Sequence, residues 1–259
     1  MPLCTTEAII LNRYVLGDTS LLVALYTKDY GKLKVVAKGA RSAKSKIAGG
    51  LEPFTHIQVS FRRREQRELQ TLSQVEVVTS FRHLGEDLTK MAYAGAVTEM
   101  INRLVIGEEP SPSLFGLLLE ALMELNRHPA DAGEVLFWGF ELRFAVLFGY
   151  APQFVSCPVC HRPLDDGEAR FSPALGGVLC PRCFGQDSGA LPIAMGTVKV
   201  LERIQAMPLS LLSRLKPSRL SQREIAQVLR AFLVYHTEDA RELKSLKFLR
   251  AVQHEVSGE

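Results

Sequence analysis

Four cysteines in two Cys-x-x-Cys pairs constrain this chain more than any other feature of its sequence. The pairs are Cys157 with Cys160 and Cys180 with Cys183, and 19 residues lie between them. This spacing is typical of a structural zinc site, because each tight turn presents two thiolates and two turns complete a tetrahedron. Protein ligands then fill every position and leave none for a catalytic water. The pattern therefore predicts one structural Zn²⁺.

The segment around the cysteines, residues 152–192, is too rich in turn residues to bury a core of its own. Its turn formers are Pro158, Pro163, Gly167, Pro173, Gly176, Gly177, Pro181, Gly185 and Gly189. We expect the metal to replace that core, since zinc-finger peptides bind structural zinc with about 10–16 kcal/mol of apparent free energy. The fifth cysteine, Cys4, is expected to be a small, partly buried thiol.

Three other uses of the cysteines fit the sequence less well. Cys157 to His161 matches the haem-attachment pattern Cys-x-x-Cys-His, but that chemistry needs export, and we expect no secretory leader at Met1. A redox dithiol normally comes as a single pair. A zinc deaminase has its His-x-Glu upstream of the cysteines, whereas His236 to Glu238 lies downstream. Closed structural zinc remains the best interpretation.

Charge is distributed unevenly along a composition that is otherwise ordinary for a globular protein. Hydrophobic residues make up 47% of the chain and charged residues 23%, with no run of eighteen uncharged apolar residues, so we expect no membrane span. Residues 1–80 carry twelve Lys/Arg and seven Asp/Glu, whereas residues 81–156 carry five and ten. A polyanion is therefore expected at the N-terminal end. With no leader expected and a tetrathiolate site predicted, we expect the chain to lie in a reducing cytoplasm.

The first eighty residues have the pattern of five short β-strands. Branched and aromatic residues dominate five runs that turn signals separate, at 5–14, 20–27, 32–37, 54–61 and 68–78. Five short strands favour a small closed barrel, because closure removes exposed edges. An OB-fold and an SH3-like barrel both remain open on this evidence.

After Ser80 the hydrophobic period becomes helical, which makes the fold class α+β. We expect helices over 88–105, from Ser111-Pro112 to before Pro129, over 134–149 and over 195–207. Ser221 to Glu224 has the form of a capping box, and a last short helix is expected around Leu243 to Leu249.

A basic segment joins the third and fourth strand runs. Between Asp29 and Glu52 there are six cations and no acid, and the loop 39–50 is rich in glycine and serine. Such a loop can follow a phosphodiester chain and release its counterions, although a solvated connector is the simpler alternative. A second cluster follows the fourth strand run. The candidate DNA-binding residues are Lys34, Lys38, Arg41, Lys44, Lys46, Arg62, Arg63 and Arg64. Tyr14, Tyr26, Tyr30 and Phe61 could stack on bases or fill the core.

No enzyme active site is evident in the sequence. It has no Walker loop, no G-x-S-x-G and no G-x-G-x-x-G, and its six histidines are scattered. We therefore expect a binding protein with no catalytic residues.

The ordered motifs of the chain resemble the RecO family of bacterial DNA-repair proteins. The resemblance lies in Tyr14-x-x-Gly-Asp-Thr-Ser-Leu-Leu-Val23, Tyr26-Thr-x-x-x-Gly-Lys-Leu33, Val36-Ala-Lys-Gly-Ala-Arg41 and Leu51-Glu-Pro-Phe54. A helical middle and a late four-cysteine knuckle follow in the family's order, so the resemblance spans nearly the whole chain. Some family members lack the cysteines, which implies that zinc is not required for the family's activity.

This resemblance implies an N-terminal OB-fold at 1–80 and an α-helical domain at 81–259, interrupted by a zinc knuckle at 152–192. It implies a non-enzymatic mediator of the RecFOR pathway of recombinational repair after DNA damage, cytoplasmic and nucleoid-associated. Such proteins bind single- and double-stranded DNA, anneal strands, engage RecR, and help RecA replace single-stranded DNA-binding protein (SSB). They also bind the acidic C-terminal tail of SSB in the helical domain, and contact RecF and RecA indirectly. The cations available here for that tail are Arg103, Arg127 and Arg143.

Two functions from other classes compete with this one. An RNA-binding OB/zinc-ribbon protein associated with translation or RNA processing would share the barrel and the knuckle. A hydrolase or nuclease with a zinc appendage would need a carboxylate cluster that the basic N-terminal region lacks. Comparing affinity for DNA with affinity for RNA of the same sequence separates the first of these from a repair mediator.

Overall fold

The structure is a computed structural model that describes residues 2–43, 45, 47–63, 67–237 and 243–257. The chain forms two compact units. The first comprises Met1–Ala130 and Leu243–Glu259, and the second comprises Asp131–Glu242. The C-terminal segment thus belongs to the unit that contains the N-terminus.

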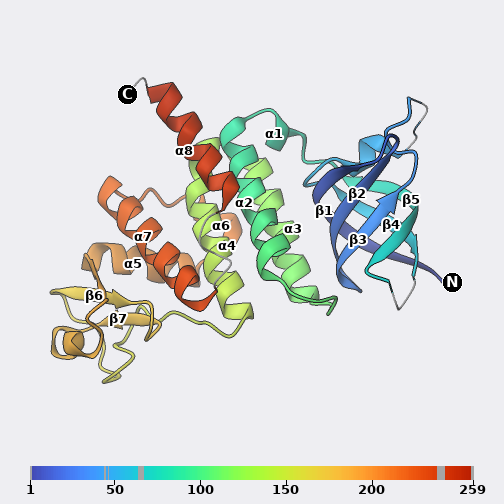
Figure 1. The fold of residues 1–259 in the computed structure, drawn as a ribbon. Helices are drawn as coiled ribbons and strands as arrows, with labels where there is room; N and C mark the ends of the chain where they lie inside the picture. Colours follow the sequence, from blue (N-terminus) through green and yellow to red (C-terminus); the bar gives the residue numbers. More distant parts are fainter. Residues whose placement is uncertain (1, 44, 46, 64–66, 238–242, 258–259) are drawn as a thin grey trace. The chain divides into compact units, whose positions relative to one another are not determined.

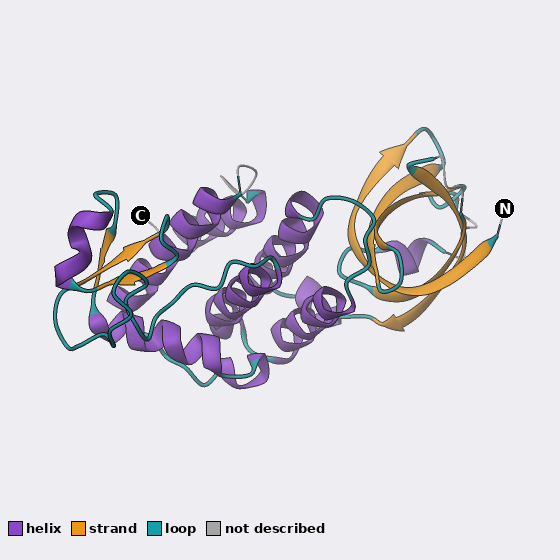
Figure 2. Ribbon diagram, turned by 90° about the horizontal axis from the view of Figure 1, so that it is seen from below, coloured by secondary structure: helices purple, strands orange, loops and turns teal. Residues whose placement is uncertain are grey.

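A closed five-stranded barrel opens the first unit. Its strands are β1 (Leu3–Leu16), β2 (Ser20–Thr27), β3 (Gly31–Ala37), β4 (His56–Arg62) and β5 (Leu69–Thr79). They close in the order β1-β2-β3-β5-β4, with β3 and β5 parallel, and Figure 2 shows the ring that they form. This order is that of an OB-fold, which confirms the predicted α+β class and resolves the choice between two barrels.

Alternate side chains of each strand fill the barrel interior, as the period of two requires. Leu21, Val23 and Leu25 point inward from β2, and they meet Leu33, Val35, Ala37, Ile57, Val59 and Phe61. One strand boundary was predicted wrongly. Phe54 has a φ of 70°, outside the extended region, so β4 begins at His56. A short 3₁₀ turn, Ala48–Leu51, precedes it and leads the chain from β3 toward β4.

The helices of the first unit are α1 (Arg82–Gly85), α2 (Leu88–Leu104), α3 (Pro112–Arg127) and α8 (Lys244–Ser257). Ser111 caps α3 by accepting a hydrogen bond from the Leu114 N–H, and Pro112 takes the first helical position, as predicted. Helix α8 lies along α2 (Figure 1). The Glu99 carboxylate of α2 accepts the N–H groups of Lys244 and Ser245, each at 3.0 Å, and so caps α8.

In its described residues, the second unit contains four helices and a small sheet. Its helices are α4 (Gly133–Leu147), α5 (Met195–Ala206), α6 (Leu209–Leu212) and α7 (Arg219–His236), and short 3₁₀ turns cover Ala130–Ala132 and Pro181–Gln186. Strands β6 (Ala169–Ser172), β7 (Gly177–Leu179) and β8 (Leu191–Ile193) pair in the order β7-β6-β8. Helix α4 is apolar nearly all round, as the sequence indicated, and packs on α5, α6 and α7.

The capping box expected at Ser221 is wrong. Ser218 caps α7 instead, since its hydroxyl accepts the Ser221 N–H at 3.1 Å, so the helix begins three residues earlier. Glu224 reaches across to α5, where its carboxylate accepts hydrogen bonds from the Ala194 N–H and the Thr197 hydroxyl. A tertiary contact has thus replaced the local one. None of the helices in the described part of the chain has both the length and the apolar character needed to span a membrane.

Candidate metal centre and nucleic-acid surface

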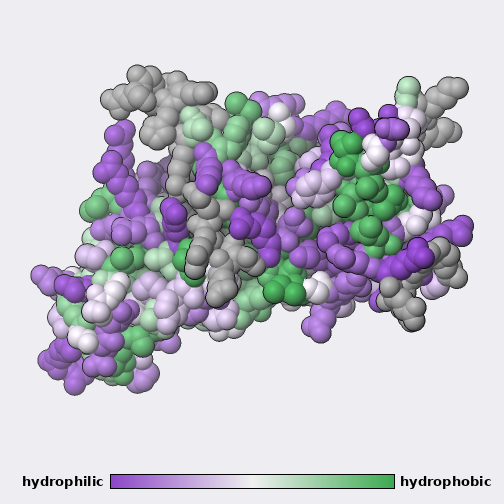
Figure 3. All heavy atoms as spheres, viewed as in Figure 1, coloured by the Kyte–Doolittle hydropathy of each residue, from purple (hydrophilic) through white to green (hydrophobic). Residues whose placement is uncertain are grey.

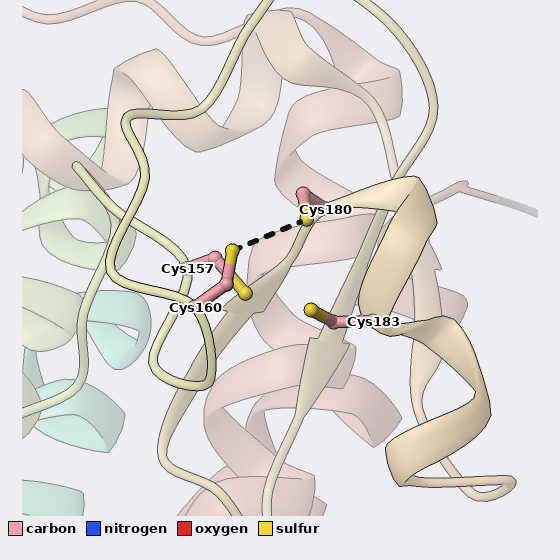
Figure 4. A group of neighbouring side chains, drawn as sticks. All are labelled: Cys157, Cys160, Cys180 and Cys183. Carbon is pink, nitrogen blue, oxygen red and sulfur yellow. Dashed lines mark hydrogen bonds between the residues drawn. The ribbon is translucent and has the colours of Figure 1, made fainter.

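The four predicted metal ligands come together in the second unit. The sulfur atoms of Cys157, Cys160, Cys180 and Cys183 all lie within 4.8 Å of one another, and none is in a disulfide. Cys160 Sγ and Cys180 Sγ are 3.7 Å apart, and Figure 4 shows the two pairs facing each other. A tetrahedral ion with bonds of about 2.3 Å to sulfur holds its ligands at nearly this separation. The donor set therefore fits one metal ion.

Local turns aim each pair at the common centre. The His161 N–H donates to the Cys157 carbonyl at 2.9 Å, and His161 has a left-handed φ of 59° that closes the first turn. In the second pair, the Cys183 N–H donates to the Cys180 carbonyl at 2.8 Å, with Pro181 at the start of the 3₁₀ turn. Proline and left-handed residues are common in such turns because they fix the backbone before the metal binds.

The pKa values of the cysteine thiols favour binding of a cation by the cluster. Burial by itself raises the pKa of the Cys157 thiol, but backbone N–H groups of Cys160, Cys180 and Val159 outweigh it and bring the pKa to about 6. Burial and the neighbouring thiols raise the pKa of Cys183 to about 12. One thiolate therefore forms readily, while further deprotonation places negative charges side by side. A divalent ion removes that repulsion.

The apolar core around the cluster is small, as predicted. Its buried members are Cys157, Cys183, Leu179 and Ala190, with Leu164 and Phe184 partly buried against them. Two of the four buried residues are ligands themselves. The cysteine cluster is thus part of the core that holds this segment, rather than an addition to a core that is already complete.

A second candidate site lies on the outer face of the barrel. Since Leu21 and Val23 point inward, Leu22 between them points outward. The register places Tyr14 opposite Leu22, and Leu22 opposite Val36, which forms an apolar row across β1, β2 and β3. Tyr14 is 49% exposed. Figure 3 shows a hydrophobic patch over this part of the barrel. We call Tyr14, Leu22 and Val36 the barrel row.

Cations flank the barrel row. Lys34 lies on the outer face of β3 and pairs with Glu68, and Lys38 is exposed directly after β3. Arg41 joins the end of β3 to the β1–β2 turn, because its Nη1 donates to the Gly17 and Asp18 carbonyls at 3.2 and 3.1 Å. The remaining guanidinium N–H groups of Arg41 have room to meet a phosphate, since the side chain is exposed.

The other candidates lie in several settings. Arg62 is exposed at the end of β4, and the Arg63 guanidinium lies 5.1 Å from the centre of the Tyr30 ring. Lys44, Lys46 and Arg64 fall outside the described residues. The assignment of all these cations to DNA contact stays a prediction.

Three of the four aromatics considered for base stacking serve the fold instead. Tyr26 and Phe61 are fully buried, and Tyr30 packs edge-on against Phe61 at 5.4 Å. Lys32, the first cation of the basic segment, likewise serves the fold. Its ammonium donates to the Asn102 and Val105 carbonyls at the end of α2, and burial lowers its pKa. Tyr14 differs from the other three aromatics because it is exposed, and the sequence alone does not reveal this difference.

The arginines considered for tail binding all have partners in the structure. Arg103 pairs with Glu99 at 3.3 Å, and Arg127 pairs with Glu124 at 2.8 Å. Arg143 donates to the carbonyls of Gly139 and Met207. It therefore acts as a structural cation that joins α4 to the C-terminal end of α5.

Comparison with known proteins identifies the family of this chain. Residues 1–81 match the family model "Recombination protein O N terminal", and residues 85–247 match "Recombination protein O C terminal". A "DNA repair protein RecO" of Pelotomaculum thermopropionicum is 35% identical over 96% of this chain and 94% of its own length. Those of Symbiobacterium thermophilum and Bacillus pumilus are 34% and 31% identical, over 96% and 97% of this chain and 97% and 95% of their own lengths. The chain belongs to the RecO family of DNA repair proteins.

Proposed function

We propose that this protein is a non-enzymatic mediator of recombinational DNA repair. It binds single- and double-stranded DNA, promotes strand annealing and, with RecR, helps RecA replace SSB. The observation that carries the proposal is the barrel row, an apolar strip on the outer face of a RecO-family OB-fold with cations beside it. We assign DNA binding to a domain at 1–80 and protein recognition to a domain at 81–259 that the knuckle at 152–192 interrupts.

The barrel surface suits a single strand because it offers both kinds of contact. Lys38 and Arg41 meet phosphates and release counterions, which gives affinity without sequence preference. The barrel row supplies an apolar surface that contacts a base and its sugar. Tyr14 is the aromatic residue of the row, and a base stacks on its ring. The Asn12 amide donates to the Tyr14 hydroxyl at 3.0 Å and limits rotation of the ring. A duplex has no free base faces, so it uses the cations alone.

Simultaneous replacement of Arg41, Lys44 and Lys46 by Ala should weaken single-stranded DNA binding. The slope of log affinity against log salt concentration should become shallower by up to about 2, at about 0.7 per lost phosphate contact. Annealing should slow as well, because less positive charge is left to offset repulsion between strands. A matched control removes Arg13, Lys28 and Lys199, which already pair with Glu52, Glu7 and Asp166. Equal slopes for the two triple variants would show that the loop is only a solvated connector.

Tyr14→Ala should weaken single-stranded DNA binding by about 1–3 kcal/mol, the usual contribution of one stacked base, and leave duplex binding nearly unchanged. Val15→Ala is the control, since Val15 is also exposed on β1 but pairs with the inward-facing Leu21. Titrating both variants with a labelled oligonucleotide and with its duplex measures the preference. A Tyr14 variant that loses both affinities equally, or neither, would remove the stacking role.

We further propose that the cysteine cluster holds one structural Zn²⁺. The cluster offers four thiolates and no open position, so a bound zinc ion supplies only cross-linking of the two turns. Partners of the 81–259 domain are RecR and the SSB tail, with RecF and RecA reached indirectly. Higher affinity for RNA than for DNA of the same sequence, without annealing, would favour an RNA-binding function instead.

A further inference from the structure

Helix α7 carries a row of arginines on the side that faces away from its own core. At 100° per residue, Arg219, Arg223 and Arg230 fall within about 40° of one another around the helix axis. All three side chains are exposed. The buried residues Ile225, Val228 and Phe232 lie on the opposite side of the helix. We call these three arginines the α7 row.

No acid on α7 opposes this charge. Glu224, the one acidic residue of the helix, turns toward α5 and accepts hydrogen bonds there. Two other exposed cations of the unit are neutralised, since Lys199 pairs with Asp166 and Lys216 with Asp131, both at 2.8 Å. Among the described residues, no salt bridge involves a member of the α7 row.

The spacing of the row suits a phosphodiester backbone. A rise of 1.5 Å per residue puts Arg219 and Arg223 about 6 Å apart and Arg223 and Arg230 about 10 Å apart along the axis. Phosphates of one strand follow one another about every 3.4 Å along a helix axis, so a strand that tracks α7 passes each guanidinium. Guanidinium groups also match phosphate geometry through paired N–H donors.

The surface between the arginines favours a polyanion over an acidic peptide with an apolar tip. Ala226 and Gln227, the exposed residues between Arg223 and Arg230, are small or polar. They offer no large apolar side chain to bury a hydrophobic anchor, and the exposed Leu220 lies about 60–100° around the helix axis from the row. The positive end of the α7 dipole at Ser218 adds to the field of the row.

We propose that the α7 row binds the phosphate backbone of a second nucleic-acid strand, distinct from the strand on the barrel. This inference rests on the proposed DNA-binding function. Annealing brings two polyanions together, and the repulsion between them falls when each has its own cationic surface. The barrel and α7 belong to different units, and in this proposal each unit binds its own strand.

The test compares Arg223→Gln/Arg230→Gln with the control Lys199→Gln/Lys216→Gln, which removes the same charge from the same unit. Two non-complementary oligonucleotides with donor and acceptor dyes report capture of a second strand by energy transfer, and a single oligonucleotide reports first-strand affinity. At about 0.15 M salt the α7 variant should capture the second strand up to about tenfold more weakly, with a salt slope shallower by up to about 1.4. First-strand affinity and the melting temperature should match those of the control.

Equal second-strand capture by the two variants would overturn the inference. So would an equal loss of first- and second-strand affinity, because the row would then belong to one continuous site. Loss of binding to a polyglutamate peptide with strand capture intact would reassign the row to an acidic protein. If the unmodified chain bound no single-stranded DNA at all, the proposed function would fail before this inference was reached.

Discussion

Cys157→Ser is expected to abolish tight metal binding and to unfold the segment around β6, β7 and β8. Metal content should fall from one ion per chain toward zero after dialysis. Cys157 is fully buried, and its sulfur lies within 4.8 Å of the other three. Three thiolates without the fourth bind zinc far more weakly, and site formation contributes about 10–16 kcal/mol in zinc fingers.

The loss should appear as insoluble protein or as a large fall in the melting temperature of the second unit. Cys4→Ser is the matched control, because Cys4 lies in β1 and packs on the barrel core. That variant should keep one metal ion per chain and melt close to the parent. Metal analysis of reduced protein that found no metal, or a Cys157 variant as stable as the Cys4 variant, would contradict a structural metal site.

The second large effect is expected at Gly31, the first residue of β3, directly after the turn from β2. Gly31 has a φ of 62°, and a Cβ at this position would lie 2.5 Å from the Glu109 carbonyl oxygen and 2.8 Å from the Glu108 backbone. These contacts are backbone atoms of the loop between α2 and α3, which cannot rotate away as a side chain can. Gly31→Ala should therefore separate this turn from the loop, at about 3 kcal/mol or more of unfolding free energy.

Gly17→Ala separates crowding from backbone strain. Gly17 has nearly the same φ, 63°, but a Cβ at this position would have no other atom within 4 Å. The substitution should destabilise the fold by only about 1–2 kcal/mol, the usual effect of one left-handed L-residue. Urea unfolding of both variants measures the difference. Equal destabilisation would show that the barrel turn does not depend on close approach to the α2–α3 loop.

Features that depend on neighbouring residues in the chain could be predicted from the sequence. The strand period, the cap at Ser111 and the cysteine spacing each reflect geometry within a few residues. Features set by tertiary contact could not. Glu224 had the local pattern of a capping residue, yet its carboxylate bonds across to α5. The return of α8 to α2 through Glu99 joins residues that are 145 apart in sequence.

In the candidate DNA surface, too, local sequence predicts some features and tertiary contacts determine the others. Charge predicted a basic segment, but Lys32 lies against the end of α2, and only burial distinguishes Tyr14 from Tyr26. The α7 row could have been found in the sequence by applying a helical period to residues 219–230. The predicted helix start at Ser221 left Arg219 outside the helix. Glu224 directly follows Arg223 and lowers the net charge of the segment in the sequence.

We expect this chain to bring complementary strands together by binding them, without catalysis. The most direct measurement is the annealing rate of two complementary oligonucleotides coated with SSB, with no nucleotide triphosphate added. The unmodified chain should accelerate annealing, and the Arg41, Lys44 and Lys46 triple variant should do so less while it stays folded. Annealing no faster than the spontaneous rate with the unmodified, metal-loaded chain would contradict the account.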